Sequence, residues 1–325
     1  MFLDWLWLII GMVLLIKGAD FFVDGASKIA KALKIPTLII GLTLVSMGTS
    51  APELSVSLNA SLIGSNDISF GNVIGSNIFN TFFILGSASL FIPLVFDESM
   101  RKYDIPIMFG IYGLMLLFGF VITPYKLDLI ESLILVVLFA TYIVSLIYRA
   151  KKSNNNDIEE KKEVVTKKQI IISIILTIVG LAAIIFGGDL VVDSAKAIAL
   201  QYGMSEALVG LTIVAVGTSL PELVTSVVAS IKKENDIAVG NVIGSNIFNI
   251  LFILGTSSSI SNLQISTDMG LGINKALFDL IVLLGSGLII LIISKLSPKL
   301  KKWQGIIFLL LYAGYLAFII IRDFQ

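Results

Sequence analysis

The sequence predicts an all-α integral membrane protein with ten transmembrane helices, arranged as two inverted repeats of five helices. Three observations lead to this fold class: an apolar composition, a long internal repeat, and an odd number of helices in each half. Hydrophobic residues make up 56% of the 325 residues and charged residues only 14%, whereas soluble domains average about 25% charged residues. The chain therefore needs a lipid bilayer around it.

Apolar runs of about 20 residues recur from end to end, and each is long enough to cross ~30 Å of hydrocarbon. The strands of a β-barrel would be short and alternating, which these runs are not. The first run lacks a basic leader and its first charge is Asp4, so we expect a retained helix and not a signal peptide. The expected helices span residues 3–27, 36–62, 70–94, 104–123, 127–149, 169–199, 206–231, 238–260, 274–294 and 303–321.

The two halves of the chain are repeats of each other at a shift of 169 positions. Residues Gly71–Gly86 match Gly240–Gly255 with two mismatches in sixteen. With five helices in each half, the second copy must enter the membrane upside down, which is the usual build of secondary transporters. The same shift aligns Gly18 with Gly187, Asp20 with Asp189, Asp24 with Asp193, Pro52 with Pro221 and Glu53 with Glu222.

The halves are expected to be residues 1–148 and 169–325, joined by a linker at 149–168. The linker is polar and charged and lacks apolar periodicity, so we interpret it as solvated. If both termini lie outside the cell, 18 of the 23 Lys and Arg residues face the cytoplasm. Positive charge favours the cytoplasmic side, so we expect a multi-pass plasma-membrane protein with both termini outside and the linker inside.

Two matching segments carry an acid and a proline inside an apolar run. Pro52 and Pro221 have no N–H, so each fails to bond the carbonyl four residues back, at Gly48 and Gly217. A freed carbonyl inside a membrane needs another partner, and a cation can be one. The segments are residues 41–54, GLTLVSMGTSAPEL, and 210–223, GLTIVAVGTSLPEL.

The acids in these segments are the strongest functional signal. Carboxylates inside membrane helices are costly and usually functional. Hydroxyls beside them usually bond their own backbone, and Gly and Pro often only kink a helix. The whole set recurs in register, however, which favours a shared site. Its members are Thr49, Ser50 and Glu53 in the first half, and Thr218, Ser219 and Glu222 in the second.

The third and eighth expected helices supply further polar groups. Ser76 and Asn80 are four residues apart and share a helix face, as do Ser245 and Asn249. Gly75 and Gly244 allow another backbone to come close. Asn77 and Asn246 lie on a different face, where we expect them to bond neighbouring backbone.

The chain contains no Cys and no His, which excludes disulfides, thiol or imidazole catalysis and the usual zinc sites. All candidate ligands are oxygens, which suit hard cations such as Ca²⁺ and Na⁺. Glu53 and Glu222 together carry two negative charges, which one Ca²⁺ or two Na⁺ neutralise. Unpaired buried carboxylates are very costly. The empty site should therefore resist crossing, and transport would be an obligatory exchange.

The motifs Gly-Thr-Ser-x-Pro-Glu and Gly-Asn-x-x-Gly-Ser-Asn-x-x-Asn, each present twice, resemble the two alpha repeats of the cation/calcium exchanger superfamily, here 41–86 and 210–255. The prokaryotic sodium/calcium exchanger type is the most similar. The resemblance implies ten helices, alternating access, and electrogenic exchange of Na⁺ against Ca²⁺. It also implies that the long first and sixth helices slide across the others as a gate.

The resemblance further implies bound Ca²⁺ and Na⁺ as cargo, no cofactor, no enzymatic activity and no nucleic-acid partner; we expect a monomer. The implied backbone ligands are the carbonyls of Ser46 and Ala215. The implied side-chain ligands are Thr49, Ser50, Glu53, Ser76, Asn80, Thr218, Ser219, Glu222, Ser245 and Asn249, with Gly48, Pro52, Gly217 and Pro221 as helix breakers.

Three alternatives stay open: Ca²⁺/H⁺ antiport, a passive cation channel and an intramembrane protease. Potassium-dependent relatives carry Asp where Asn249 stands, so this Asn argues against K⁺ co-transport. Two further pairs of acids, Asp20 with Asp24 and Asp189 with Asp193, lie toward helix ends. They are either solvated or draw cations to the two mouths of the pathway. We also expect Lys17 to pair with Asp20.

Overall fold

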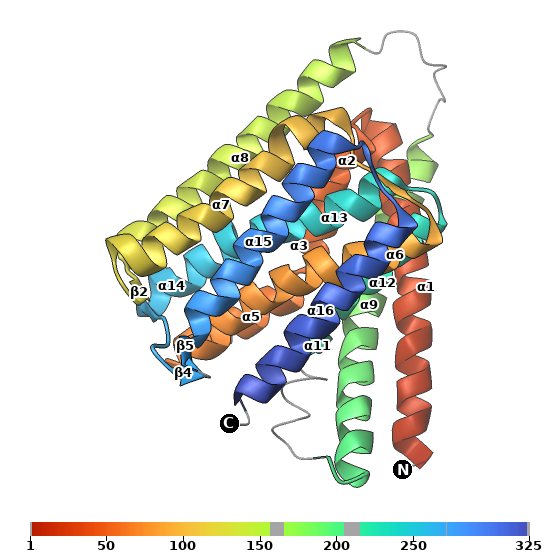
Figure 1. The fold of residues 1–325 in the computed structure, drawn as a ribbon. Coiled ribbons are helices and arrows are strands. Elements are labelled where there is room, and N and C mark those ends of the chain that lie inside the picture. The colour runs from red at the N-terminus through yellow and green to blue at the C-terminus, as the bar shows by residue number, and fades with distance from the viewer. Residues whose placement is uncertain (1, 157–165, 205–214, 271, 324–325) are drawn as a thin grey trace.

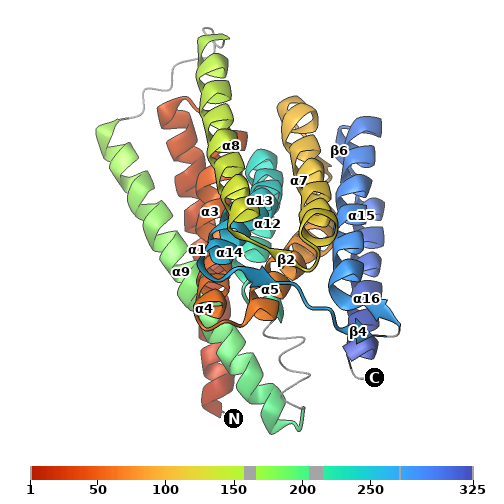
Figure 2. The ribbon, with the colours of Figure 1, turned by 90° about the vertical axis from the view of Figure 1, so that its left-hand side faces the viewer.

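A computed structural model describes residues 2–156, 166–204, 215–270 and 272–323. It is helical throughout, with six short strands in three two-stranded pairs (Figures 1 and 2). The uninterrupted long helices are α1 (Phe2–Leu33), α8 (Leu129–Asn156), α9 (Lys167–Gln201), α15 (Lys275–Leu296) and α16 (Lys302–Asp323).

The other helices contain breaks or π-helical turns, labelled η. In the first half these are α2 (Thr37–Ile40), η1 (Gly41–Val45), α3 (Ser46–Thr49) and α4 (Ala51–Leu62); α5 (Asn66–Phe79), η2 (Asn80–Ile84) and α6 (Leu85–Phe91); and η3 (Met100–Asp104), α7 (Ile105–Leu117) and η4 (Phe118–Ile122). In the second half they are α11 (Ala215–Gly217) and α12 (Leu220–Ile231), then α13 (Asn235–Phe248), η6 (Asn249–Leu254) and α14 (Gly255–Ser261).

All three strand pairs are antiparallel; two join connections that are far apart in the sequence and the third is local. The pairs are β1 (Leu94–Val95) with β6 (Lys299–Leu300), β2 (Lys126–Leu127) with β3 (Leu263–Gln264), and β4 (Met269–Gly270) with β5 (Ile273–Asn274).

Among the described residues, eight helices are long and apolar enough to cross a membrane. A ninth is counted if α2–α3 and α4, bent by 49°, form one span. The expected helix at 206–231 begins outside the described residues, and its described part ends in the 12-residue α12. The prediction of a helical membrane protein is therefore confirmed, while ten helices in inverted repeats stay a prediction.

The expected linker is partly helical. Helix α8 continues through Asn156 and α9 begins at Lys167, so helix occupies both edges of the predicted 149–168 segment. Thr166 starts α9 with a capping box: its Oγ1 accepts from the backbone N of Gln169, whose Oε1 accepts from the backbone N of Thr166. This capping box explains why α9 begins two residues before the predicted start at 169.

Helices α1 and α9 lie side by side and run at an angle to the rest of the bundle (Figures 1 and 2). With 32 and 35 residues, they would be about 48 and 52 Å long at 1.5 Å per residue. A Cβ on Gly18 would lie 2.8 Å from the carbonyl oxygen of Gly180, and one on Gly11 2.9 Å from that of Gly187. Glycine therefore lets the two backbones touch along this pair.

The centre of the bundle is formed by the two helices that carry the Gly-Asn motifs. In the span Asn235–Ser261, 94% of the most apolar window is buried, and 78% in Asn66–Phe91, against 11% in Lys302–Arg322. Helix α13 packs on η1 and α3, while α5 packs on α4 and α11. Each central helix thus lies against the broken helices of both halves, since α13 also packs on α12.

Candidate ion-binding site

Both proline-containing helices break where the sequence predicts. The break in the first half falls at Ser50 (φ −83°, ψ 12°) and that in the second at Ser219 (φ −90°, ψ 6°). Pro52 and Pro221 then stand in the first turn of α4 and α12, where a missing N–H is tolerated. Each break therefore places a serine hydroxyl and the start of a new helix at the same point.

Each acid accepts a hydrogen bond from a serine of the other half. Ser50 Oγ donates to Glu222 Oε1 at 2.7 Å, and Ser219 Oγ donates to Glu53 Oε1 at 2.9 Å. The sequence analysis assigned both serines and both acids to a shared site without saying which serine faces which acid. The structure joins each serine to the acid of the other half, so the two kinks form a single site.

The serines of the central helices complete this arrangement. Ser245 Oγ lies 3.0 Å from Ser50 Oγ, and Ser76 Oγ lies 3.1 Å from Ser219 Oγ. These hydroxyls therefore lie one contact away from the carboxylates, and the ligand role expected for Ser76 and Ser245 stays a prediction.

The acids of the site are buried, and the site contains oxygens without hydrogen-bond partners, while Thr218 is half-buried. The fully buried side chains include Thr49, Ser50, Glu53, Asn80, Ser219, Glu222, Ser245 and Asn249. Among the described residues, the buried atoms that lack a hydrogen bond include Glu53 Oε2, Glu222 Oε2, Asn80 Oδ1 and Asn249 Oδ1. Orphaned buried polar atoms are costly. A set made only of carboxylate, amide and hydroxyl oxygens fits a hard cation as its missing partner.

The two threonines contact asparagines that the sequence analysis did not assign to the site. Thr49 Oγ1 donates to Asn241 Oδ1 at 3.0 Å, and Thr218 Oγ1 donates to Asn72 Oδ1 at 3.3 Å. Asn72 Nδ2 also donates to the backbone carbonyl of Glu53 at 3.2 Å. Asn72 therefore joins α4, which carries Glu53, to the kink of the second half. Asn241 likewise joins α12, which carries Glu222, to the kink of the first half. The recurrence of these asparagines at the second position of the Gly-Asn motif was the available signal.

The expected backbone ligands are only partly described. The Ser46 carbonyl accepts from the backbone N of Ser50 at 3.0 Å and lies 3.4 Å from Ser245 Oγ. It therefore borders the site but is already hydrogen-bonded. Ala215 is the first residue of α11, and its side chain lies outside what the structure describes.

The prediction for the remaining asparagines is right for one and wrong for the other. Asn77 Nδ2 donates to the backbone carbonyl of Asn246 at 2.9 Å, as expected. Asn246 Nδ2 instead donates to a side chain, Thr81 Oγ1, at 3.0 Å. The second half has Ile250 at the position of Thr81, so only Asn246 finds a hydroxyl there.

The pairing of Lys17 with Asp20 is also wrong. The Nζ of Lys232, at the end of α12, lies 2.6 Å from carboxylate oxygens of both Asp20 and Asp24. We call these three residues the ionic latch. Asp20 therefore pairs with a lysine of the other half, because α1 packs on α12.

The second pair of acids lies in a different setting. Asp189 and Asp193 line a cavity of about 460 Å³ together with Pro52, Thr218 and Pro221. Neither carboxylate forms an ion pair with a described residue. The cavity therefore connects these acids to the residues at both kinks.

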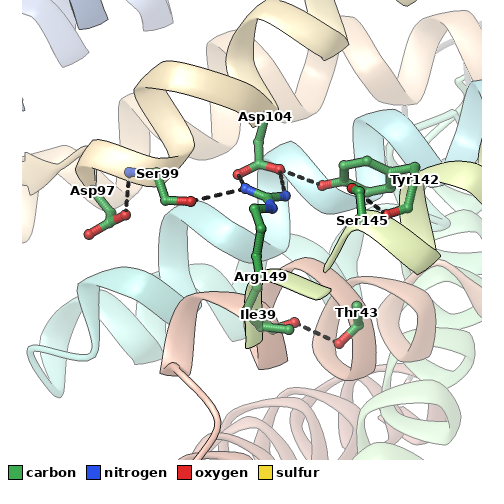
Figure 3. Close-up of polar contacts among 8 residues, drawn as sticks. All are labelled: Ile39, Thr43, Asp97, Ser99, Asp104, Tyr142, Ser145 and Arg149. Carbon is green, nitrogen blue, oxygen red and sulfur yellow. Dashed lines mark hydrogen bonds and ion pairs between the residues drawn. The ribbon is translucent and has the colours of Figure 1, made fainter. Parts of the chain in front are cut away.

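A buried carboxylate outside the site is already compensated. Figure 3 shows Asp104, the last residue of η3, contacting Arg149 and Tyr142 of α8. Arg149 also donates to Ser99 at 3.0 Å, and Tyr142 Oη donates to Asp104 Oδ1 at 3.0 Å. Because Asp104 has its own cation, it is not a candidate ion ligand.

A similar trio lies near the C-terminus, where Arg322 Nη1 and Tyr315 Oη lie 3.0 and 3.2 Å from Asp279 Oδ1. Sequence analysis missed both trios, although a Tyr seven residues before an Arg occurs in both helices.

Broken membrane helices that gather buried carboxylates at their kinks are typical of ion-coupled secondary transporters. Residues 3–148 and 172–321 match the sodium/calcium exchanger protein family. The chain belongs to this family of membrane antiporters, which are transporters and not enzymes, and the resemblance predicted from the two motif pairs is confirmed.

Individual relatives agree over nearly the whole chain. It is 36% identical to the putative antiporter CaxA of Alkalimonas amylolytica, over 95% of this chain and 96% of the relative. It is 35% identical to the sodium/calcium exchanger MaX1 of Methanosarcina acetivorans, over 96% and 97%. A solved structure of the sodium-calcium exchanger NCX_Mj has a TM-score of 0.83 at 32% identity, and the match covers 97% of this chain and 98% of that one. These matches support the fold of a Ca²⁺ exchanger and place the chain in that class of transporter.

Proposed function

We propose that this chain exchanges Ca²⁺ for Na⁺ across the plasma membrane by alternating access, with net movement of charge. The observation that carries the proposal is the crossed pair of buried acids. Each acid accepts a hydrogen bond through one oxygen from the opposite half, and its second oxygen is left unpaired. The sodium/calcium exchanger relatives support Na⁺ as the counter-ion.

The proposed side-chain ligands are the ten predicted from the motifs: Thr49, Ser50, Glu53, Ser76 and Asn80 with Thr218, Ser219, Glu222, Ser245 and Asn249. Carboxylate and amide oxygens would contact the cations directly. The serines would hold the acids in place through the crossed hydrogen bonds until a cation arrives. The carbonyls of Ser46 and Ala215 would complete the set, and Gly48, Pro52, Gly217 and Pro221 would shape the two breaks.

We propose the architecture of two inverted repeats, residues 1–148 and 169–325, joined by a cytoplasmic linker at 149–168, with ten helices and a monomer as the working unit. Figure 1 supports placing both termini on one side, because the N and C marks lie at one end of the molecule, whereas the end of α8 and the start of α9 lie at the other. Helices α1 and α9 would move together as the gate, since glycine contacts join them along their length.

The physical reason for exchange is the charge of the empty site. Two ionised carboxylates removed from water without a counter-charge would cost many kcal/mol. Bound Ca²⁺ or Na⁺ supplies the missing positive charge. The transporter would therefore pass through its closed intermediate with cations bound, and either cation could satisfy the requirement.

Reconstitution of the full chain into liposomes tests the proposal. An outward Na⁺ gradient should drive uptake of radioactive Ca²⁺ above its equilibrium level, and a set membrane potential should change the rate. Uptake driven by a proton gradient instead of Na⁺ would support Ca²⁺/H⁺ antiport. Downhill uptake that ignores both gradients would support a passive channel.

A further inference from the structure

The side-chain amide of Asn77 is held in one orientation by a partner that can only accept a hydrogen bond. Its Nδ2 donates to the backbone carbonyl of Asn246 at 2.9 Å, and a carbonyl oxygen has no proton to give. The opposite rotation of the amide would place two oxygens against each other. The Asn77 Oδ1 must therefore face the other way, toward Asn249.

This orientation fixes the next amide in turn. Asn249 Nδ2 donates to Asn77 Oδ1 at 3.0 Å. The Asn249 Oδ1 is consequently turned away from Asn77. This oxygen is buried and has no hydrogen-bond partner among the described residues. Asn249 lies four residues after Ser245 and so on the same helix face, and Ser245 lies within 3.0 Å of Ser50 at the first kink.

The matching position in the other half lacks this restraint. The counterpart of Asn77 is Asn246, whose Nδ2 is used on Thr81. The counterpart of Asn249 is Asn80, and neither Nδ2 nor Oδ1 of Asn80 has a hydrogen-bond partner among the described residues. Two near-identical motifs thus differ in one respect: only the amide of Asn249 is oriented by a neighbour.

We propose that Asn77 is a positioning residue for cation binding. Its side-chain oxygen holds the amide nitrogen of Asn249 and thereby presents Asn249 Oδ1 to the transported cation. This inference rests on the proposed function, because it takes Asn249 as a cation ligand. Asn77 itself does not touch the cation.

A double-mutant cycle between Asn77 and Asn249 tests the inference. The half-saturating Ca²⁺ concentration and the maximal rate of Na⁺-driven Ca²⁺ uptake are measured for wild type, Asn77→Leu, Asn249→Ala and the double variant. Asn77→Leu should raise the half-saturating Ca²⁺ concentration about tenfold with little change in maximal rate, because the amide of Asn249 becomes free to rotate. The double variant should be no weaker than Asn249→Ala alone. Effects that multiply across the cycle would overturn the inference.

Asn246→Leu is the matched control, since Asn246 is equally buried and also loses a hydrogen bond. Its effect should multiply with that of Asn249→Ala. Energetic coupling to Asn249 that is found for Asn77 and not for Asn246 separates positioning from general packing. Thermal unfolding of each purified variant checks that it is folded, and Asn77→Ala completes the cycle if the Leu variant does not fold.

Asn77→Asp separates the two ends of the amide. It keeps an oxygen toward Asn249 but loses the Nδ2 bond to the Asn246 carbonyl. Because the Asp also places an oxygen against that carbonyl, some weakening is expected, but positioning predicts a smaller rise in the half-saturating Ca²⁺ concentration than for Asn77→Leu. Equal weakening by Leu and Asp would show that only the structural bond matters and would overturn the inference. Absence of Na⁺-driven Ca²⁺ uptake in wild type would instead refute the proposed function, so the two failures are distinguishable.

Discussion

At the kinks the two halves of the chain are nearly interchangeable, whereas at the ends of α1 and α9 they differ. Ser50 binds Glu222 as Ser219 binds Glu53, at 2.7 and 2.9 Å. The ionic latch has no such counterpart, because the position that matches Lys232 is Ile63. A transporter with inverted repeats must offer its cargo a similar site from both sides, but the two sides need not close with equal strength.

The different ends show how the symmetry is broken. Lys232 contacts Asp20 and Asp24 of α1, and Ser27 of α1 donates to Glu234 at 2.9 Å. At the other end, Asp189 and Asp193 line the cavity beside the kinks. Under the proposed orientation, the closed end is cytoplasmic and the cavity is external. The latch would therefore favour the outward-facing state.

Removing either acid should have the largest effect, and a similar one in both halves. Glu53→Gln and Glu222→Gln each leave one negative charge for a divalent cation. Ca²⁺ exchange should fall on the order of a hundredfold or more in each, as expected when one member of a buried charged set is removed. Na⁺-driven Ca²⁺ uptake measures this. Wild-type flux in either variant would contradict the assignment of the acids.

The crossed hydrogen bonds should come next. Ser50→Ala and Ser219→Ala each remove a bond to a carboxylate, which is worth about 1.5–3 kcal/mol. The half-saturating Ca²⁺ concentration should rise about tenfold or more in each. The sharper test is coupling: Ser50 should couple energetically to Glu222 and not to Glu53. Coupling within one helix would contradict the crossed arrangement.

The two trios should each contribute to stability and little to exchange, and the first should contribute more, because Asp104 is fully buried whereas Asp279 is 21% exposed. Tyr142→Phe and Tyr315→Phe each remove a hydrogen bond to an aspartate. Each should lower the free energy of unfolding by about 1–3 kcal/mol, measured by thermal unfolding in detergent. A large change in Ca²⁺ affinity with unchanged stability would mean that a trio belongs to the site.

The ionic latch should give the smallest effect, because its side chains are 24–45% exposed and such ion pairs contribute about 1 kcal/mol or less. Lys232→Met should shift the balance between the two conformations severalfold at most. The chain contains no Cys, so a single cysteine introduced at the latched end reports its opening by labelling rate. Ile63→Lys, which adds a lysine at the matching position, should shift the balance the other way. If neither variant changes the labelling rate, the ionic latch does not control the balance between the two conformations.

The pH dependence of the latch has a definite sign. Partial burial lowers the pKa of Lys232, but hydrogen bonds to Asp20 and Asp24 outweigh it and raise the pKa above its usual value. A raised pKa stabilises the paired state fully below about pH 10.4. This contribution is lost as the pH rises through the higher pKa of the folded protein. Labelling at the latched end should therefore be constant around neutral pH and increase only in strong alkali.

The sequence was informative where a residue has a physical meaning independent of its neighbours. A carboxylate in an apolar run and a proline in a helix predicted Glu53, Glu222 and the breaks. Spacing along one helix could not show which helices face each other, so the crossed bonds of Ser50 and Ser219 were missed. For the same reason Asp20 was given to Lys17, three residues away, and not to Lys232, which is distant in sequence.

The requirement for a counter-ion is tested most directly by Ca²⁺ release into different media. Liposomes containing the protein are loaded with radioactive Ca²⁺ and diluted into medium with Na⁺, with Ca²⁺, or with neither. Charge compensation of Glu53 and Glu222 predicts rapid release into Na⁺ or Ca²⁺ and almost none into medium lacking both. Equal release into all three media would show that the empty site crosses freely, and would contradict the account.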